Sequence, residues 1–101
     1  PAGLLDNNST KIGAFPFVKV MGVKQIPTHR FIAWLVSLGL RYERTKASHD
    51  HYNYPKGNPK RLTRTVTVRT KYKEIPILHI HTNLKTLGIS KETFEQQIKN
   101  F

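Results

Sequence analysis

The sequence predicts a compact α+β domain, an α-β-β-β-α sandwich. Two helices are expected to cover one face of a three-stranded antiparallel sheet, and a short extra helix follows at the C-terminal end. Three observations predict this fold: apolar residues recur at helical spacing in two segments, a segment between them alternates with a period of two, and Gly or Pro residues separate the segments. A length of 101 residues fits one domain. We place this domain at residues 26–101 and treat residues 1–25 as a tail of uncertain origin, to which we assign no chemistry.

The first helix is expected to begin at Thr28, an N-cap residue type that directly follows Pro27. Its apolar stripe consists of Phe31, Ile32, Leu35 and Leu38. Trp34 lies beside this stripe, and we assign it to the core. Gly39 ends the helix, because glycine tolerates the left-handed backbone conformation of a helix C-terminus.

Three strands are expected next, at residues 40–46, 49–54 and 62–69. The third is the clearest, because threonines alternate there with arginine and valine residues. The cluster at 55–59 contains two prolines and one glycine, and it predicts a turn. Short connections of this kind favour three sequential antiparallel strands in a meander.

The second helix carries an apolar stripe made of Ile77, Ile80, Leu84 and Leu87. Gly88 is expected to end it. Ser90 then caps the short last helix, which turns Phe94 and Ile98 toward the core.

The chain is strongly basic, with 17 Lys and Arg residues against 6 Asp and Glu residues and a net charge of +11. Between positions 41 and 73, ten basic residues are opposed only by Glu43 and Asp50. A field of one sign argues for an anionic partner. RNA is the first candidate, ahead of an acidic protein or an anionic membrane surface. The residues expected to contact RNA phosphates are Arg44, Lys46, Lys60, Arg61, Arg64, Arg69 and Lys71.

Several functional classes are disfavoured by composition. The chain has no cysteine, which excludes a disulfide framework, a thiolate nucleophile and a cysteine metal site. The lack of cysteine fits a reducing compartment, so we expect a cytoplasmic protein. The longest apolar run, residues 31–40, is too short to span a bilayer, and no membrane association is expected.

Two histidine pairs raise the question of a metal site. They are His49 with His51, and His79 with His81. The second pair falls on a predicted helix, where residues two apart do not share a face. Because other ligand types are scarce, we expect neither a metal nor another cofactor.

The stretch at residues 46–54 carries the most chemistry. His49 is a side chain able to exchange a proton near neutrality. On a strand, His51 points to the same face as His49, so it is a candidate supporting acid, although an exposed surface histidine is the commoner case. Tyr52 is a candidate for stacking on an RNA base, although tyrosines on strands more often pack inward.

Four short segments carry a resemblance to a known family. They are Leu38-Gly39-Leu40, Lys46-Ala47-Ser48-His49, the aromatic Tyr52, and Leu87-Gly88-Ile89-Ser90. In these segments and in element order, residues 26–101 resemble the HicA toxins. Those proteins are small, ribosome-independent mRNA interferases with a fold like that of double-stranded-RNA-binding domains (dsRBD-like). The resemblance implies the same fold and activity here, in a type II toxin–antitoxin system.

The resemblance also implies roles for single residues. The family has a Gly-Ser-His segment whose histidine is catalytic, so this role falls on His49 and the serine of the motif on Ser48. Ala47 stands where the family usually has glycine. If that glycine has a positive φ, alanine is strained there and shifts His49. The partner implied is a HicB-like antitoxin that blocks the active surface.

Three functions are consistent with these residues. The first is a metal-independent RNA endonuclease that acts on mRNA through His49 and is neutralised by an antitoxin. The second is a non-catalytic RNA-binding module with the same dsRBD-like fold, a reading that Ala47 favours. The third is an assembly protein whose basic face docks an acidic partner.

Overall fold

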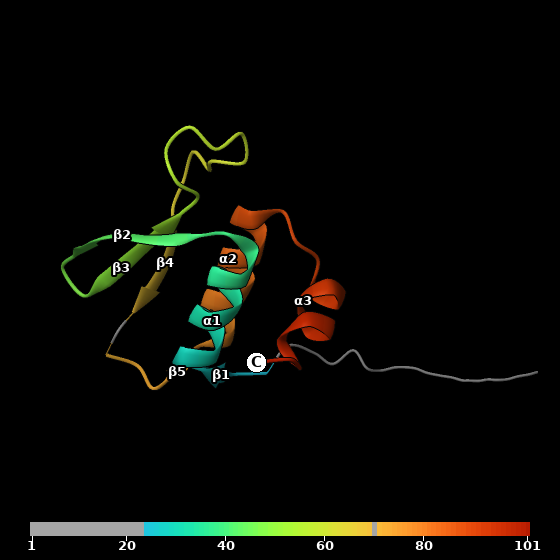
Figure 1. Ribbon diagram of the computed structural model, residues 1–101. Coiled ribbons are helices and arrows are strands. Elements are labelled where there is room, and N and C mark those ends of the chain that lie inside the picture. The colour runs from blue at the N-terminus through green and yellow to red at the C-terminus, as the bar shows by residue number, and fades with distance from the viewer. Residues whose placement is uncertain (1–23, 70) are drawn as a thin grey trace, which may run out of the picture.

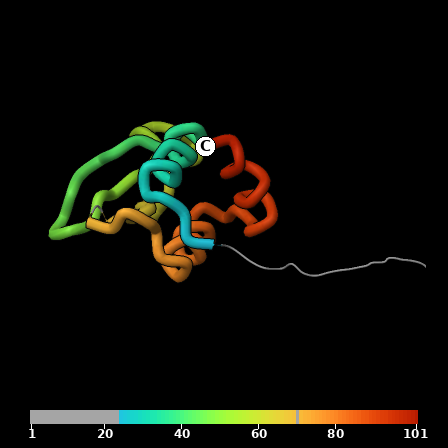
Figure 2. Tube along the Cα trace, turned by 90° about the horizontal axis from the view of Figure 1, so that it is seen from below, coloured from blue at the N-terminus to red at the C-terminus, as the bar shows by residue number. Residues whose placement is uncertain are grey.

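The computed structural model describes residues 24–69 and 71–101. These residues form an α+β domain in three layers: a three-stranded sheet, two helices, and a short last helix on the far side (Figure 1). Seen from below, the chain shows the same order of layers (Figure 2). Most of the expected tail, residues 1–23, lies outside the described residues, and its last two residues, Lys24 and Gln25, are exposed.

Helix α1 (Thr28–Leu38) buries Phe31, Trp34 and Leu35 and ends at Gly39, which has a φ of 108°. The prediction for this helix is confirmed except at its first turn. Thr28 is the first helical residue and not the N-cap. Its backbone N–H donates to the carbonyl of Lys73 at 2.8 Å, so the connection that leads to the second helix satisfies an N–H group that a cap would otherwise serve.

The sheet consists of β2 (Arg41–Lys46), β3 (His49–Asn53) and β4 (Val66–Arg69), antiparallel and in that spatial order. The predicted meander is therefore confirmed. The third strand begins later than expected because Asn53 replaces strand pairing with side-chain bonds. Its Oδ1 accepts from the N–H of Leu62 at 2.9 Å, and its Nδ2 donates to the Leu62 carbonyl at 3.0 Å.

One face of the sheet belongs to the core. Tyr52 pairs with Val66 across β3 and β4, and these residues and Val68 are buried. Residues that alternate with them project to the other face. Helices α1 and α2 (Ile77–Leu87) lie between the sheet and the last helix (Figures 1 and 2).

Helix α2 is also fastened to the free edge of β4. Asn83 is only 3% exposed. The N–H of Thr67 donates to the Asn83 side-chain oxygen at 3.3 Å, and the Asn83 side-chain nitrogen donates to the Thr67 carbonyl at 2.9 Å. The amide thereby satisfies backbone groups that an edge strand otherwise leaves open.

The last helix, α3 (Lys91–Ile98), closes the core from the far side as predicted. The Ser90 side chain accepts a hydrogen bond from the Thr93 N–H, which is the expected cap. Phe94 is buried against Trp34, with ring centroids 4.7 Å apart in an edge-to-face arrangement.

A second, two-stranded sheet was not predicted. It pairs β1 (Ile26–Pro27) with β5 (Glu74–Ile75) just before the two long helices begin. Strands of two residues are too short to show a period in the sequence. Within the described ranges, no helix has the length and apolar content needed to cross a membrane.

Candidate functional site

The hairpin that precedes His49 has a strained turn. Lys46 pairs with His49, so Ala47 and Ser48 alone form the loop between β2 and β3. Ala47 has a φ of 56°, in the left-handed region that favours glycine. An L-residue there costs roughly 1–2 kcal/mol. Ala47 therefore occupies a turn position that favours glycine, and Ser48 occupies the second position of the turn, beside His49.

Five basic or titratable side chains share the sheet face away from the core, which we call the open sheet face. Paired residues of antiparallel strands project to the same side. His49 is paired with Lys46 on β2 and with Arg69 on β4, and His51 is paired with Arg44. The register therefore places the two histidines and three cations together, and the shared face of His49 and His51 is as predicted.

His51 is engaged within this face. Its Nδ1 lies 2.6 Å from the hydroxyl of Thr65. Burial lowers the pKa of His51 below the usual histidine value, and the nearby Arg44, His49 and Lys46 lower it further. His51 is therefore a neutral, hydrogen-bonded neighbour of His49.

His49 itself lines a small cleft between the sheet and α2. The cleft has a volume of about 110 Å³, and its walls are His49, Thr67, His79, Thr82 and Asn83. The hydrogen bonds between Asn83 and Thr67 fix the position of α2 relative to β4, and so the width of the cleft. The size suits a phosphate group and not a whole nucleoside.

One wall of the cleft continues into a stack of side chains. The Arg69 guanidinium carbon lies 4.8 Å from the centroid of the Tyr72 ring. The Tyr72 and His79 rings are nearly parallel, with an interplanar angle of 17° and centroids 6.3 Å apart. Arg69 is thus held beside His49 by register and by a cation–π contact.

Two of the predicted RNA-binding arginines contact a carboxylate. Arg61 donates to Glu43 at 2.6 Å and to the Tyr54 carbonyl at the same distance. Arg44 lies 3.2 Å from the other carboxylate oxygen. The Arg61 hydrogen bond is the main reason that the pKa of Glu43 lies below its usual value. Arg61 therefore braces the irregular stretch of β2 at Glu43, whereas the Arg44 side chain is 55% exposed and projects from the open sheet face.

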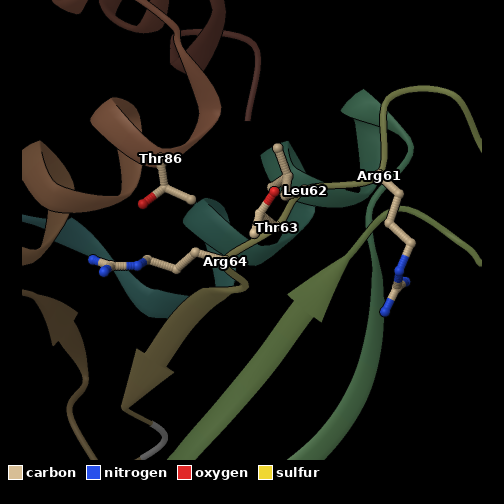
Figure 3. A pocket seen from close by; sticks show the side chains of 5 residues that line it. All are labelled: Arg61, Leu62, Thr63, Arg64 and Thr86. Carbon is tan, nitrogen blue, oxygen red and sulfur yellow. The ribbon is translucent and has the colours of Figure 1, made fainter.

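Arg64 lies away from His49. A larger hollow of about 470 Å³ is lined by Arg61, Leu62, Thr63, Arg64 and Thr86. Figure 3 shows Arg64 extending toward α2 while Arg61 points away from it. This hollow contains no side chain suited to proton transfer near neutrality, so the smaller cleft is the better candidate site. Lys60 and Lys71 are exposed outside both cavities.

Tyr52 does not fit its predicted role in base stacking. It is 7% exposed, it belongs to the core, and burial raises its pKa. Its ring packs edge-to-face against Tyr42, with centroids 6.0 Å apart. The period of the strand directs Tyr52 to the helix side. Among the tyrosines that the structure describes, the exposed ones are Tyr42 and Tyr72, at 54% and 38%.

Sequence reasoning missed the contribution of α2 to the cleft. His79 was considered only as half of a metal pair, and Asn83 was given no role in a site. Nothing local in the sequence indicates that α2 lies against the edge of β4. Residues 24–69 and 71–101 contain no group of three or more His, Cys, Asp or Glu side chains placed to hold a metal ion.

Comparisons of the chain with protein families, with curated proteins and with solved structures find no match.

Proposed function

We propose that this protein is a metal-independent RNA endonuclease of the mRNA interferase type, with His49 as its central catalytic residue. The observation that carries the proposal is the position of His49: it lines a phosphate-sized cleft and is flanked across both neighbouring strands by cations, Lys46 and Arg69. RNA cleavage without a metal needs a group that accepts the 2′-hydroxyl proton and cations that stabilise the charge on phosphorus. Both requirements meet at this place.

The resemblance to the HicA toxins supports the same assignment. The helix, three strands and helix of those toxins would correspond here to α1, β2–β4 and α2 in a dsRBD-like arrangement. The positive φ of Ala47 supports the alignment of Lys46-Ala47-Ser48-His49 with the Gly-Ser-His segment, because glycine is the residue that such a turn selects. Ser48 then lies next to the reacting group.

A protein partner of the antitoxin type is part of the proposal. Two large apolar side chains at the start of α2, Ile77 and Leu78, are 42% and 73% exposed, directly before His79 in the cleft. Exposed apolar residues that border a basic site are suited to a partner that covers the site. A HicB-like antitoxin would neutralise the toxin by such a contact.

The test is cleavage of a long, labelled single-stranded RNA by the purified chain in the presence of EDTA. We expect the parent to cut the RNA and His49→Ala to lose activity by roughly 10²–10⁴-fold, the usual contribution of a positioned acid or base. His29→Ala is the matched control, since His29 is exposed at the start of α1, outside the cleft. Circular dichroism and thermal unfolding of the variants establish that each remains folded.

A non-catalytic RNA-binding module is the second candidate, because the strain at Ala47 lies two residues before His49, in the turn that leads to it. In that case the RNA stays intact with every variant, and binding weakens steeply with salt, as contacts between cations and phosphates require. Cutting that EDTA abolishes would instead contradict the metal-independent mechanism.

A further inference from the structure

The cleft contains a second histidine from a different element. His49 comes from β3 and His79 from the first turns of α2, and both line the same volume of about 110 Å³. His81, two residues further along α2, is not among the lining residues. One member of each histidine pair therefore lines the same cleft.

The ring of His79 is held by its neighbours. It stacks on Tyr72 at an interplanar angle of 17°, and Tyr72 in turn carries the Arg69 guanidinium. The backbone N–H of His79 donates to the Pro76 carbonyl at 2.9 Å, so the residue belongs to the first hydrogen-bonded turn of the helix. A ring fixed in this way has little freedom to lose when substrate binds.

The ring nitrogens of these two histidines are available to a ligand. Within residues 24–69 and 71–101, no hydrogen bond is made to the ring of His49 or His79, whereas His51 is bonded to Thr65. His51, which the strand period made a candidate general acid, is thus hydrogen-bonded to another residue. His79 is the histidine that shares the cleft with His49.

We propose that His49 and His79 act as a base and acid pair in RNA cleavage, an inference that rests on the proposed nuclease function. His49 accepts the proton of the 2′-hydroxyl as its oxygen forms a bond to the adjacent phosphorus. The bond from phosphorus to the 5′-oxygen breaks, and His79 in its imidazolium form donates a proton to that oxygen. The products are a 2′,3′-cyclic phosphate and a 5′-hydroxyl, and proton exchange with water restores both rings.

The cations beside the pair fit the charge that this reaction develops. Lys46 and Arg69 lie opposite His49 on its two neighbouring strands, where they can bind the non-bridging phosphate oxygens. Arg69 also contacts Tyr72, which stacks on His79, so the same cation is paired with His49 across the sheet and linked to His79 through Tyr72.

The inference is tested with the full chain and a short oligoribonucleotide that contains one cleavable linkage. We expect His79→Ala and the more conservative His79→Gln to lower the cleavage rate by roughly 10²–10⁴-fold. His81→Ala is the matched control on the same helix, and it should stay within about twofold of the parent, well below the contribution of a proton-transfer group. The cyclic phosphate end is identified by mass spectrometry of the products.

A second substrate separates catalysis from positioning. In it, sulfur replaces the 5′-oxygen at the cleaved linkage, and a thiolate leaves without needing a proton. This substrate should restore His79→Ala and His79→Gln to near the parental rate, while His49→Ala stays inactive. Rescue of this kind is not expected if His79 only supports the fold.

The outcomes distinguish the two proposals. A parent that cuts both substrates, with His79 variants that are fully active or that the sulfur substrate does not rescue, would overturn the histidine pair and leave the proposed nuclease standing. A parent that cuts neither substrate would remove the nuclease function, and the histidine pair with it.

Discussion

Replacing Ala47 by glycine should make this protein more stable. The residue has a φ of 56°, and the left-handed conformation costs an L-residue roughly 1–2 kcal/mol. Glycine removes that strain, but its freer unfolded chain costs roughly 0.5–1 kcal/mol. The net expected gain in the free energy of unfolding is therefore about 0.5–1 kcal/mol.

The neighbouring residue of the same turn provides a matched control. Ser48 has no positive φ, so Ser48→Gly adds chain entropy to the unfolded state without relieving strain. It should lose about 0.5–1 kcal/mol, which separates the two variants by about 1–2 kcal/mol.

Urea and thermal unfolding measure this difference. For a domain of this size, 1 kcal/mol corresponds to about 4–8 °C in the melting temperature. Ala47→Gly should therefore melt above the parent and Ser48→Gly below it. If Ala47→Gly unfolds at or below the parental temperature, the positive φ is not a source of strain, and the argument from the turn to His49 fails.

Two further predictions concern the sheet. Asn83→Ala removes both bonds to Thr67 and leaves two backbone groups at the β4 edge without partners. We therefore expect the free energy of unfolding, measured in urea, to fall by about 2–4 kcal/mol. A loss no larger than that of Thr86→Ala, on the same helix, would show that the position of α2 does not depend on this amide. Because folding lowers the pKa of His51, the unfolded state binds a proton at this residue more readily than the folded state. The free energy of unfolding should therefore be unaffected by His51 above about pH 6.5 and should fall as the pH drops from there through the lower folded-state pKa. His51→Gln should show a smaller loss between about pH 7.5 and about pH 5, and an unchanged loss would mean that His51 is not the group responsible.

Local features of the sequence were sufficient for most of the secondary structure. The apolar stripes of α1 and α2, their terminal glycines and the Ser90 cap each depend on residues a few positions apart. The sharing of one sheet face by His49 and His51 likewise follows from the period of a strand. The start of β4 was predicted too early because the side chain of Asn53, nine residues before Leu62, forms hydrogen bonds with the backbone N–H and carbonyl of Leu62.

The sequence by itself determined that this chain carries a basic, three-stranded sheet whose strands come between two helices in chain order, with His49 directly after a short hairpin turn. Only the tertiary structure decided that Arg69 and not Arg64 lies beside this histidine, and that His79 enters the same cleft. Those facts depend on strand register and on the docking of α2 against the β4 edge. Both are set by contacts between residues far apart in the chain, which leave no periodic trace in the sequence.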